Sequence, residues 1–194
     1  MPDKEVGAAF ESGACSHLAV VLRSEAEFAP VVASFYSLGA KRGAWLAHRA
    51  VMVEDDRKAL NDAGLDVDGL ESEGRLVIEA LDLDEPPDAL PGRLEAGLNA
   101  ALDRGLTGLW SSHSPVGPGP DSFQLATAIE GAWEERFRGR PVVTLCPYVI
   151  EGLDGAGAVD RLTEVSELHE EGVLVPSRQG LQNFRRSMGN DVSA

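Results

Sequence analysis

The sequence is poor in basic residues, and lysine occurs only at Lys4, Lys41 and Lys58. Lysine and arginine together number 17, against 32 aspartates and glutamates, and the formal net charge is −15. Proteins that bind nucleic acid or anionic lipid surfaces need a basic face to contact the phosphates. We therefore expect no direct binding to nucleic acid or to a membrane, and we interpret the acidic residues as a solvated coat.

Cysteine and long apolar runs are also scarce. Cys15 and Cys146 are the only cysteines; they lie far apart and lack the spacing of a metal-binding motif, which argues against a disulfide framework. The segment 1–5 has neither the basic flank nor the apolar stretch of a signal peptide. No apolar run approaches the ~20 residues that span a bilayer. We expect a cytoplasmic protein.

A glycine-rich phosphate loop is missing from the place where it would be expected. The apolar run His17–Leu22 predicts a strand, and the segment 23–27 that follows begins a helical pattern. In nucleotide-binding α/β proteins, such a strand-to-helix turn carries glycines whose N–H groups hold phosphates. This turn has no glycine and no Gly-Lys-Ser/Thr. The pattern favours a sensor or adaptor over an enzyme.

Strand-like and helix-like segments alternate along the rest of the chain. This alternation predicts an α/β fold, a single domain with a mostly parallel sheet and helices on both faces. We assign residues 1–15 to a flexible N-terminal arm, 16–177 to the domain, and 178–194 to a tail that forms a short helix or a disordered end. Strands are expected at 17–22, 44–49, 74–79, 108–112, 141–148 and 172–176, and helices at about 28–38, 54–63, 90–102, 122–138 and 159–168.

Several short landmarks occur in a characteristic order: His17 at the start of a strand, the segments 39–43, 61–67 and 73–76, Glu130 in a helix, the run 145–148, and His169. In this order and spacing the chain resembles the MEDS family, the methanogen/methylotroph sensory domain. The resemblance implies a KaiC/RecA-like fold that has lost its phosphate loop, and a role in signal transduction. It also marks His17, Glu130 and His169 as family positions, which we interpret as structural.

The chain departs from the family pattern at several positions. Trp110 stands where the family tends to have arginine, and a proline- and glycine-rich loop at 115–120 replaces a Met-x-Trp-like element. Val149 follows Tyr148 where aspartate is usual, and Glu170 follows His169 where proline is usual. These departures leave open whether the ligand of the relatives is bound here.

Polar side chains at the carboxyl ends of the predicted strands are the candidates for ligand binding, because ligands of open parallel sheets bind at that edge. As a set they suit a small organic or anionic ligand. The alternative is that the arginines merely pair with nearby carboxylates. The candidate ligand-binding residues are Arg23, Ser24, Arg49, Ser112, His113, Cys146 and Tyr148.

A metal site formed by His17, His169 and Cys146 is a further possibility. Both histidines are expected at the start of strands and Cys146 near the end of its strand, which would separate them by roughly 17–20 Å. We therefore expect no metal, and histidines tied to backbone carbonyls. Cys146 is interpreted as an inert thiol whose pKa is raised by burial.

Glu130 lies on the border of the apolar face of its helix, where a carboxylate is partly desolvated and needs a partner. It is either a ligand-facing or general-base carboxylate, or a structural link to a neighbouring backbone group or tyrosine. We favour the structural link. The sequence shows no nucleophile–base–orienter triad, so we expect no catalytic residues and no cofactor.

The sequence therefore favours a non-catalytic sensory or regulatory signal-transduction domain that binds a small organic ligand or a signalling partner protein. The alternative is a nucleotide-binding protein or ATPase of the RecA/KaiC superfamily with an unorthodox site that uses Arg23, Arg49 and Glu130. A third possibility is a structural partner, such as a homodimer formed through an exposed edge strand.

Overall fold

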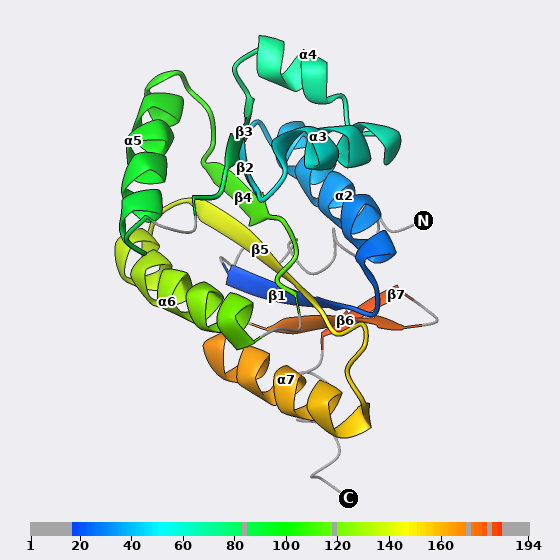
Figure 1. Ribbon diagram of the computed structural model, residues 1–194. Helices are drawn as coiled ribbons and strands as arrows, with labels where there is room; N and C mark the ends of the chain where they lie inside the picture. The colour runs from blue at the N-terminus through cyan, green and yellow to red at the C-terminus, as the bar shows by residue number, and fades with distance from the viewer. Residues whose placement is uncertain (1–16, 83–84, 118–119, 170–171, 178–179, 184–194) are drawn as a thin grey trace, which may run out of the picture.

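A computed structural model describes residues 17–82, 85–117, 120–169, 172–177 and 180–183 (Figure 1). Its centre is a seven-stranded sheet with the order β3-β2-β4-β5-β1-β6-β7. Neighbouring strands from β3 to β6 pair in parallel, and β7 pairs antiparallel with β6. The strands are β1 (His17–Leu22), β2 (Trp45–Ala50), β3 (Leu76–Ala80), β4 (Leu109–His113), β5 (Val142–Val149), β6 (Val173–Ser177) and β7 (Gly180–Asn183).

Helices cover both faces of the sheet (Figure 1). A short 3-10 helix, η1 (Glu25–Glu27), follows β1. The α-helices are α2 (Phe28–Lys41), α3 (Val53–Asp62), α4 (Val67–Ser72), α5 (Ala89–Asp103), α6 (Pro120–Phe137) and α7 (Gly155–Leu168). The structure thus confirms the predicted single-domain α/β fold with a mostly parallel sheet.

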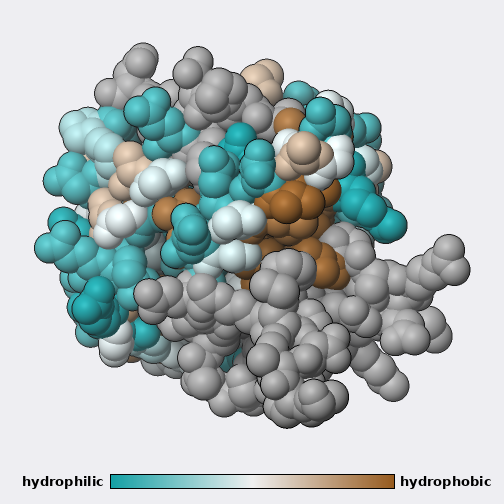
Figure 2. Space-filling view, turned by 90° about the horizontal axis from the view of Figure 1, so that it is seen from below, coloured by the Kyte–Doolittle hydropathy of each residue, from teal (hydrophilic) through white to brown (hydrophobic). Residues whose placement is uncertain are grey.

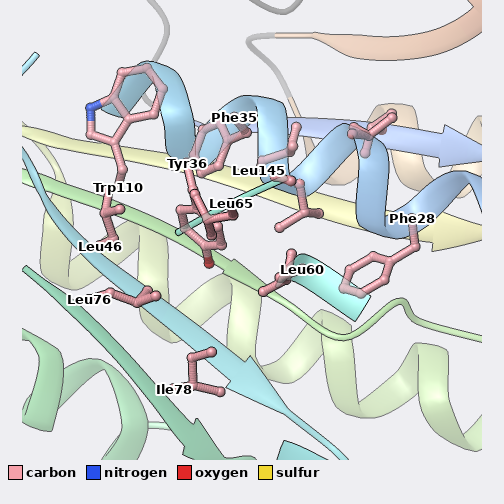
Figure 3. Close-up of a cluster of buried hydrophobic side chains, with 14 of the residues drawn as sticks. Phe28, Phe35, Tyr36, Leu46, Leu60, Leu65, Leu76, Ile78, Trp110 and Leu145 are labelled. Atoms are coloured by element: carbon pink, nitrogen blue, oxygen red, sulfur yellow. The ribbon is translucent and has the colours of Figure 1, made fainter. Parts of the chain in front are cut away.

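One face of the sheet packs against α2, α3 and α4. Alternate side chains of the strands, such as Leu46 and Trp110, meet Phe35 of α2 and Leu60 of α3 in one large apolar cluster (Figure 3). The ring centroids of Phe35 and Trp110 lie 4.8 Å apart. This face is therefore filled by hydrocarbon and by aromatic stacking.

The opposite face packs against α5, α6 and α7 and is less uniformly apolar. Leu94 and Leu98 of α5 and Trp133 of α6 cover its β2–β4 side, while Val165 of α7 covers β1 and β5. Between these two apolar clusters the strands carry polar side chains, and the candidate site lies there.

The six expected strands are all present, displaced by at most one or two residues. Pro30 falls in the first turn of α2, which a proline tolerates because the N–H that it lacks would have no helical partner there. Ser24 precedes η1, and its side chain makes no capping hydrogen bond.

The C-terminal prediction requires a correction. The tail was expected to be a short helix or a disordered end, but Gly180–Asn183 forms the strand β7 beside β6. Helix α4 was not predicted. The expected arm, residues 1–15, lies outside the described residues, as do residues 184–194.

Hydrophilic side chains dominate most of the described surface seen in Figure 2, where one hydrophobic patch lies beside residues that are not described. Among the described residues, no helix has both the length and the apolar character needed to cross a bilayer.

Candidate functional site

A cavity of about 240 Å³ opens over the face of the sheet that α5 and α6 cover. It lies toward the carboxyl ends of β2, β4 and β5, where ligands of open parallel sheets usually bind. Its apolar wall includes Leu81, Leu90, Val116, Ile129 and Trp133. Its polar lining includes Arg49, Ser111, Ser112, His113, Ser114, Glu130, Thr144 and Cys146.

Arg49 is a cationic group in the lining of this cavity, which also includes the Glu130 carboxylate, and is only 2% exposed. Its Nε lies 3.6 Å from Glu79 Oε1, and none of its three guanidinium nitrogens has a hydrogen-bond partner among the described residues. Burial lowers the pKa of Arg49 to about 10, although the Glu79 carboxylate opposes this shift. The side chain is thus a buried cation at neutral pH with unused donors.

Two further polar groups line the cavity. Thr144 Oγ1 is buried and has no hydrogen-bond partner within the described part of the chain. His113 Nδ1 lies 2.7 Å from the Ser114 carbonyl oxygen, so this nitrogen carries the proton and donates it. Burial lowers the pKa of His113, which favours the neutral imidazole. Arg49, Thr144 and His113 therefore offer donors and acceptors to a bound molecule.

A second group of side chains, the buried cluster, lies beside the cavity. It consists of His17, Glu130, Cys146 and His169, whose potential ligand atoms all lie within 4.8 Å of one another. His17 Nε2 is 2.7 Å from Glu130 Oε2 and 3.2 Å from Cys146 Sγ. His169 Nε2 is 3.4 Å from Glu130 Oε1. Glu130 and Cys146 belong to the cluster and also line the cavity.

The predicted separation of the histidines from Cys146 is therefore wrong. Strand β5 runs to Val149, so Cys146 lies inside it and not at its end. His17 is in register with Thr144, and side chains two positions apart on a strand share a face. His169 caps the carboxyl end of α7, which brings its ring to 4.6 Å from that of His17.

The electrostatics of the buried cluster depend on Glu130. Burial alone would raise the pKa of Glu130, but the neighbouring His17 and His169 outweigh it and hold the pKa well below its usual range. Burial and the Glu130 charge raise the pKa of Cys146, as predicted. The Tyr148 hydroxyl donates to Glu130 Oε1 at 3.2 Å, so the predicted link between Glu130 and a tyrosine is confirmed.

The buried cluster is not arranged as a catalytic triad. In a triad, the nucleophile and the orienting carboxylate contact opposite nitrogens of the imidazole. Here Cys146 Sγ and Glu130 Oε2 both approach Nε2 of His17. The side chains converge on one region of space, which is the arrangement of a chelating site.

The structure brings only part of the predicted ligand-binding set together. Arg49, Ser112, His113 and Cys146 line the cavity, whereas Tyr148 does not line it and instead donates to Glu130. Arg23 and Ser24 do not line it. The Arg23 side chain is 66% exposed and pairs with Glu27, which agrees with the alternative that it merely meets a carboxylate.

Sequence reasoning missed Ser111 and Thr144. Both are polar side chains on the same sheet face as predicted residues, since Ser111 lies two positions before His113 and Thr144 two before Cys146. Alternation along the strands could have identified them.

Carboxylates occupy the turn after β1, where a phosphate loop would lie. The backbone N–H of Arg23 donates to Glu27 Oε2 at 2.9 Å, and that of Glu25 donates to Glu151 Oε2 at 3.3 Å. These two amides are already bound to negatively charged groups, which is unfavourable for a phosphate.

No known family model matches the sequence, and no curated protein matches it significantly. Solved structures do resemble the fold. An uncharacterized protein from Pyrococcus horikoshii, crystallised in complex with an unknown peptide, has a TM-score of 0.57 at 13% identity, over 93% of this chain and 86% of that one.

Two further solved structures have a similar fold. A KaiC-like protein from Pyrococcus horikoshii has a TM-score of 0.53 at 13% identity, over 86% of this chain and 74% of that one. An ATP synthase subunit from Nanoarchaeum equitans has a TM-score of 0.50 at 13% identity, over 89% of this chain and 49% of that one. At this level of identity the likeness concerns the fold alone, and this chain has a KaiC/RecA-like α/β fold.

Proposed function

We propose that this chain is a non-catalytic sensory or regulatory domain that binds a small organic anion in the cavity beside Arg49. The observation that carries the proposal is the Arg49 guanidinium, buried against the cavity with no hydrogen-bond partner among the described residues. A buried cation with unused donors is costly unless an anion binds it. A carboxylate matches its planar set of donors with two parallel hydrogen bonds.

The rest of the cavity limits the size and character of the ligand. Its volume of about 240 Å³ is below the ≈ 300–1,000 Å³ of pockets that hold drug-sized molecules. Leu90, Ile129 and Trp133 provide an apolar wall. A small monocarboxylic acid with a short aliphatic or aromatic body fits both the charge and the apolar surface.

The turn after β1 supports binding without nucleotide hydrolysis. The backbone amides of Arg23 and Glu25 donate to carboxylates of the chain itself. A triphosphate would have to displace them against the negative charge of Glu25, Glu27 and Glu151. In this proposal the fold signals through a partner protein when the cavity is filled.

Thermal unfolding in the presence of a panel of small monocarboxylic acids tests the proposal, with the corresponding primary amides as uncharged controls. A ligand at about 100 times its Kd stabilises by about 2.7 kcal/mol, which corresponds to a rise of about 5–10 °C in Tm for a chain of this size. We expect such a rise with an acid and not with its amide.

Two variants localise the effect. Arg49→Met is expected to abolish the rise, and Arg23→Met, which changes an exposed arginine that does not line the cavity, is expected to retain it. The proposal fails if no acid stabilises the protein, if Arg49→Met responds like the natural sequence, or if Mg-ATP stabilises the protein and is hydrolysed.

A further inference from the structure

The buried cluster brings together four side chains of the kinds that bind transition metals. His17 comes from the start of β1, Glu130 from α6, Cys146 from β5 and His169 from the end of α7. All four residues are buried, with exposed fractions of 1–7%. Two imidazoles, a thiol and a carboxylate form a donor set that suits zinc.

Two of the distances between ligand atoms of the cluster are close to those around a tetrahedral zinc ion, and all of these atoms lie within 4.8 Å of one another. Zinc bonds of 2.0–2.3 Å place neighbouring ligand atoms about 3.3–3.8 Å apart. In the cluster, His17 Nε2 and Cys146 Sγ are 3.2 Å apart, and His169 Nε2 and Glu130 Oε1 are 3.4 Å apart. The closest pair, His17 Nε2 and Glu130 Oε2 at 2.7 Å, needs only a small separation to admit the ion.

His169 provides an independent indication of a cation. Its Nδ1 lies 3.0 Å from the Val165 carbonyl oxygen, so Nδ1 donates to that carbonyl and Nε2 is the nitrogen left to face Glu130. Nε2 is buried and makes no hydrogen bond among the described residues, although it faces a Glu130 oxygen. This approach to a carboxylate is favourable when a positive charge lies between the two atoms, either a proton on Nε2 or a metal ion.

This arrangement also has the partners expected around a metal ligand. Metal-binding histidines usually donate their second ring N–H to a carbonyl or carboxylate, which fixes the ring. His169 does so through Val165, whereas His17 Nδ1 lies 3.9 Å from Glu134 Oε2, which is too long for a hydrogen bond. A thiolate from Cys146 and the Glu130 carboxylate together carry two negative charges, which neutralise a divalent cation.

We propose that His17, Glu130, Cys146 and His169 bind one Zn²⁺ ion. With four protein ligands the site is closed, so its role is structural. The ion joins β1, β5, α6 and the end of α7, and thereby fixes one wall of the cavity. The proposal does not depend on the identity of the organic ligand or on Arg49.

The first experiment measures zinc in the purified chain. Protein purified without chelators is analysed for metal, and metal-free protein is titrated with Zn²⁺ against a chromophoric chelator. We expect one equivalent per chain, with removal of the ion lowering Tm. Loss of a residue that only hydrogen-bonds to a metal ligand weakens metal affinity by about 10–100-fold. Cys146→Ala and His169→Gln each remove a ligand, so each is expected to weaken zinc affinity by at least about 10–100-fold.

The matched control is His48→Gln. His48 is an equally buried histidine on the opposite face of the sheet, paired with Asp56, and its replacement is expected to leave zinc affinity unchanged. Arg49→Met is likewise expected to keep the zinc, so failure of organic-anion binding and failure of metal binding are distinguishable.

Cobalt substitution gives a readout that does not require any variant to fold. Co²⁺ bound to the natural chain is expected to show the near-ultraviolet thiolate-to-cobalt charge-transfer band and the intense visible bands of a tetrahedral site. The proposal is overturned if that charge-transfer band is absent. It is also overturned if the folded Cys146→Ala and His169→Gln variants bind Zn²⁺ as tightly as the natural chain. Zinc would then bind elsewhere, and the cluster would be hydrogen-bonded without a metal.

Discussion

Arg49 and Glu79 form an ion pair without a hydrogen bond: Nε of Arg49 lies 3.6 Å from the Glu79 carboxylate. Glu79 is on β3, next to β2, and its side chain is 33% exposed. The carboxylate therefore only partly compensates a cation that is otherwise surrounded by the cavity wall. Arg49 is therefore a buried charge that the described residues compensate only weakly.

A stability prediction follows for Arg49→Met. Removing a buried, poorly paired charge relieves its desolvation cost, and the Glu79 carboxylate left behind is 33% exposed and stays solvated. We expect the Tm of the ligand-free variant to equal or exceed that of the natural chain, as measured by calorimetry. A fall of several degrees would instead indicate that Arg49 is mainly structural.

The pH dependence of stability is predicted from His48. Burial lowers the pKa of His48 from 6.5, against the opposing influence of Asp56. Between the lowered pKa and 6.5 the unfolded chain binds more protons than the folded chain, so the free energy of unfolding rises with pH. We expect the stability that His48 contributes as a neutral ring to be lost as the pH falls below about 6.5.

Urea unfolding at pH 7.5 and at pH 5.5 measures this effect. The difference between the two pH values is expected to be smaller in His48→Gln, which keeps a hydrogen-bonding side chain but cannot take up a proton. His113, whose pKa burial also lowers, contributes in the same direction and remains in the variant. An unchanged pH dependence in His48→Gln would contradict the prediction.

Two glycines in helices are expected to respond oppositely to the same substitution. A Cβ on Gly39 of α2 would lie 2.8 Å from Trp110 and 2.9 Å from Leu46, so Gly39→Ala overpacks the cluster of Figure 3 and should destabilise by about 1–3 kcal/mol. Gly131 of α6 has open space around it, so Gly131→Ala should stabilise by about 0.4–1 kcal/mol. Denaturant midpoints of the two variants decide the comparison.

Nucleotide is expected to leave the protein unchanged. Because the amides of Arg23 and Glu25 donate to Glu27 and Glu151, we predict no rise in Tm with Mg-ATP and no phosphate release above background. The double variant Glu27→Gln with Glu151→Gln removes the negative charge and serves as a comparison. Turnover by the natural chain would revive the ATPase alternative.

The sequence was sufficient for the layered architecture but not for the pairing of the strands. Apolar runs such as 141–148 identified the parallel strands because strands buried on both faces need hydrocarbon at nearly every position. Strand β7 was missed since its four residues, Gly180–Asn183, have no such run and become a strand only by pairing with β6.

The residues of the candidate site could also be predicted only in part. Arg49 and His113 could be placed at the sheet edge from their positions alone, whereas the contact between His17 and Cys146 depends on the register of β1 with β5. A strand's register is fixed by the packing of the whole sheet. Placing Cys146 at a strand end produced an error in distance, and the expectation of no metal had been based on that distance.

Glu130 and Cys146 face the cavity on one side and the buried cluster on the other. A molecule in the cavity and an ion in the cluster would then share two side chains. By thermodynamic linkage, if the organic anion raises the affinity of the protein for zinc by some factor, zinc raises the affinity for that anion by the same factor. The occupancy of the proposed zinc site would then change the affinity of the proposed anion site.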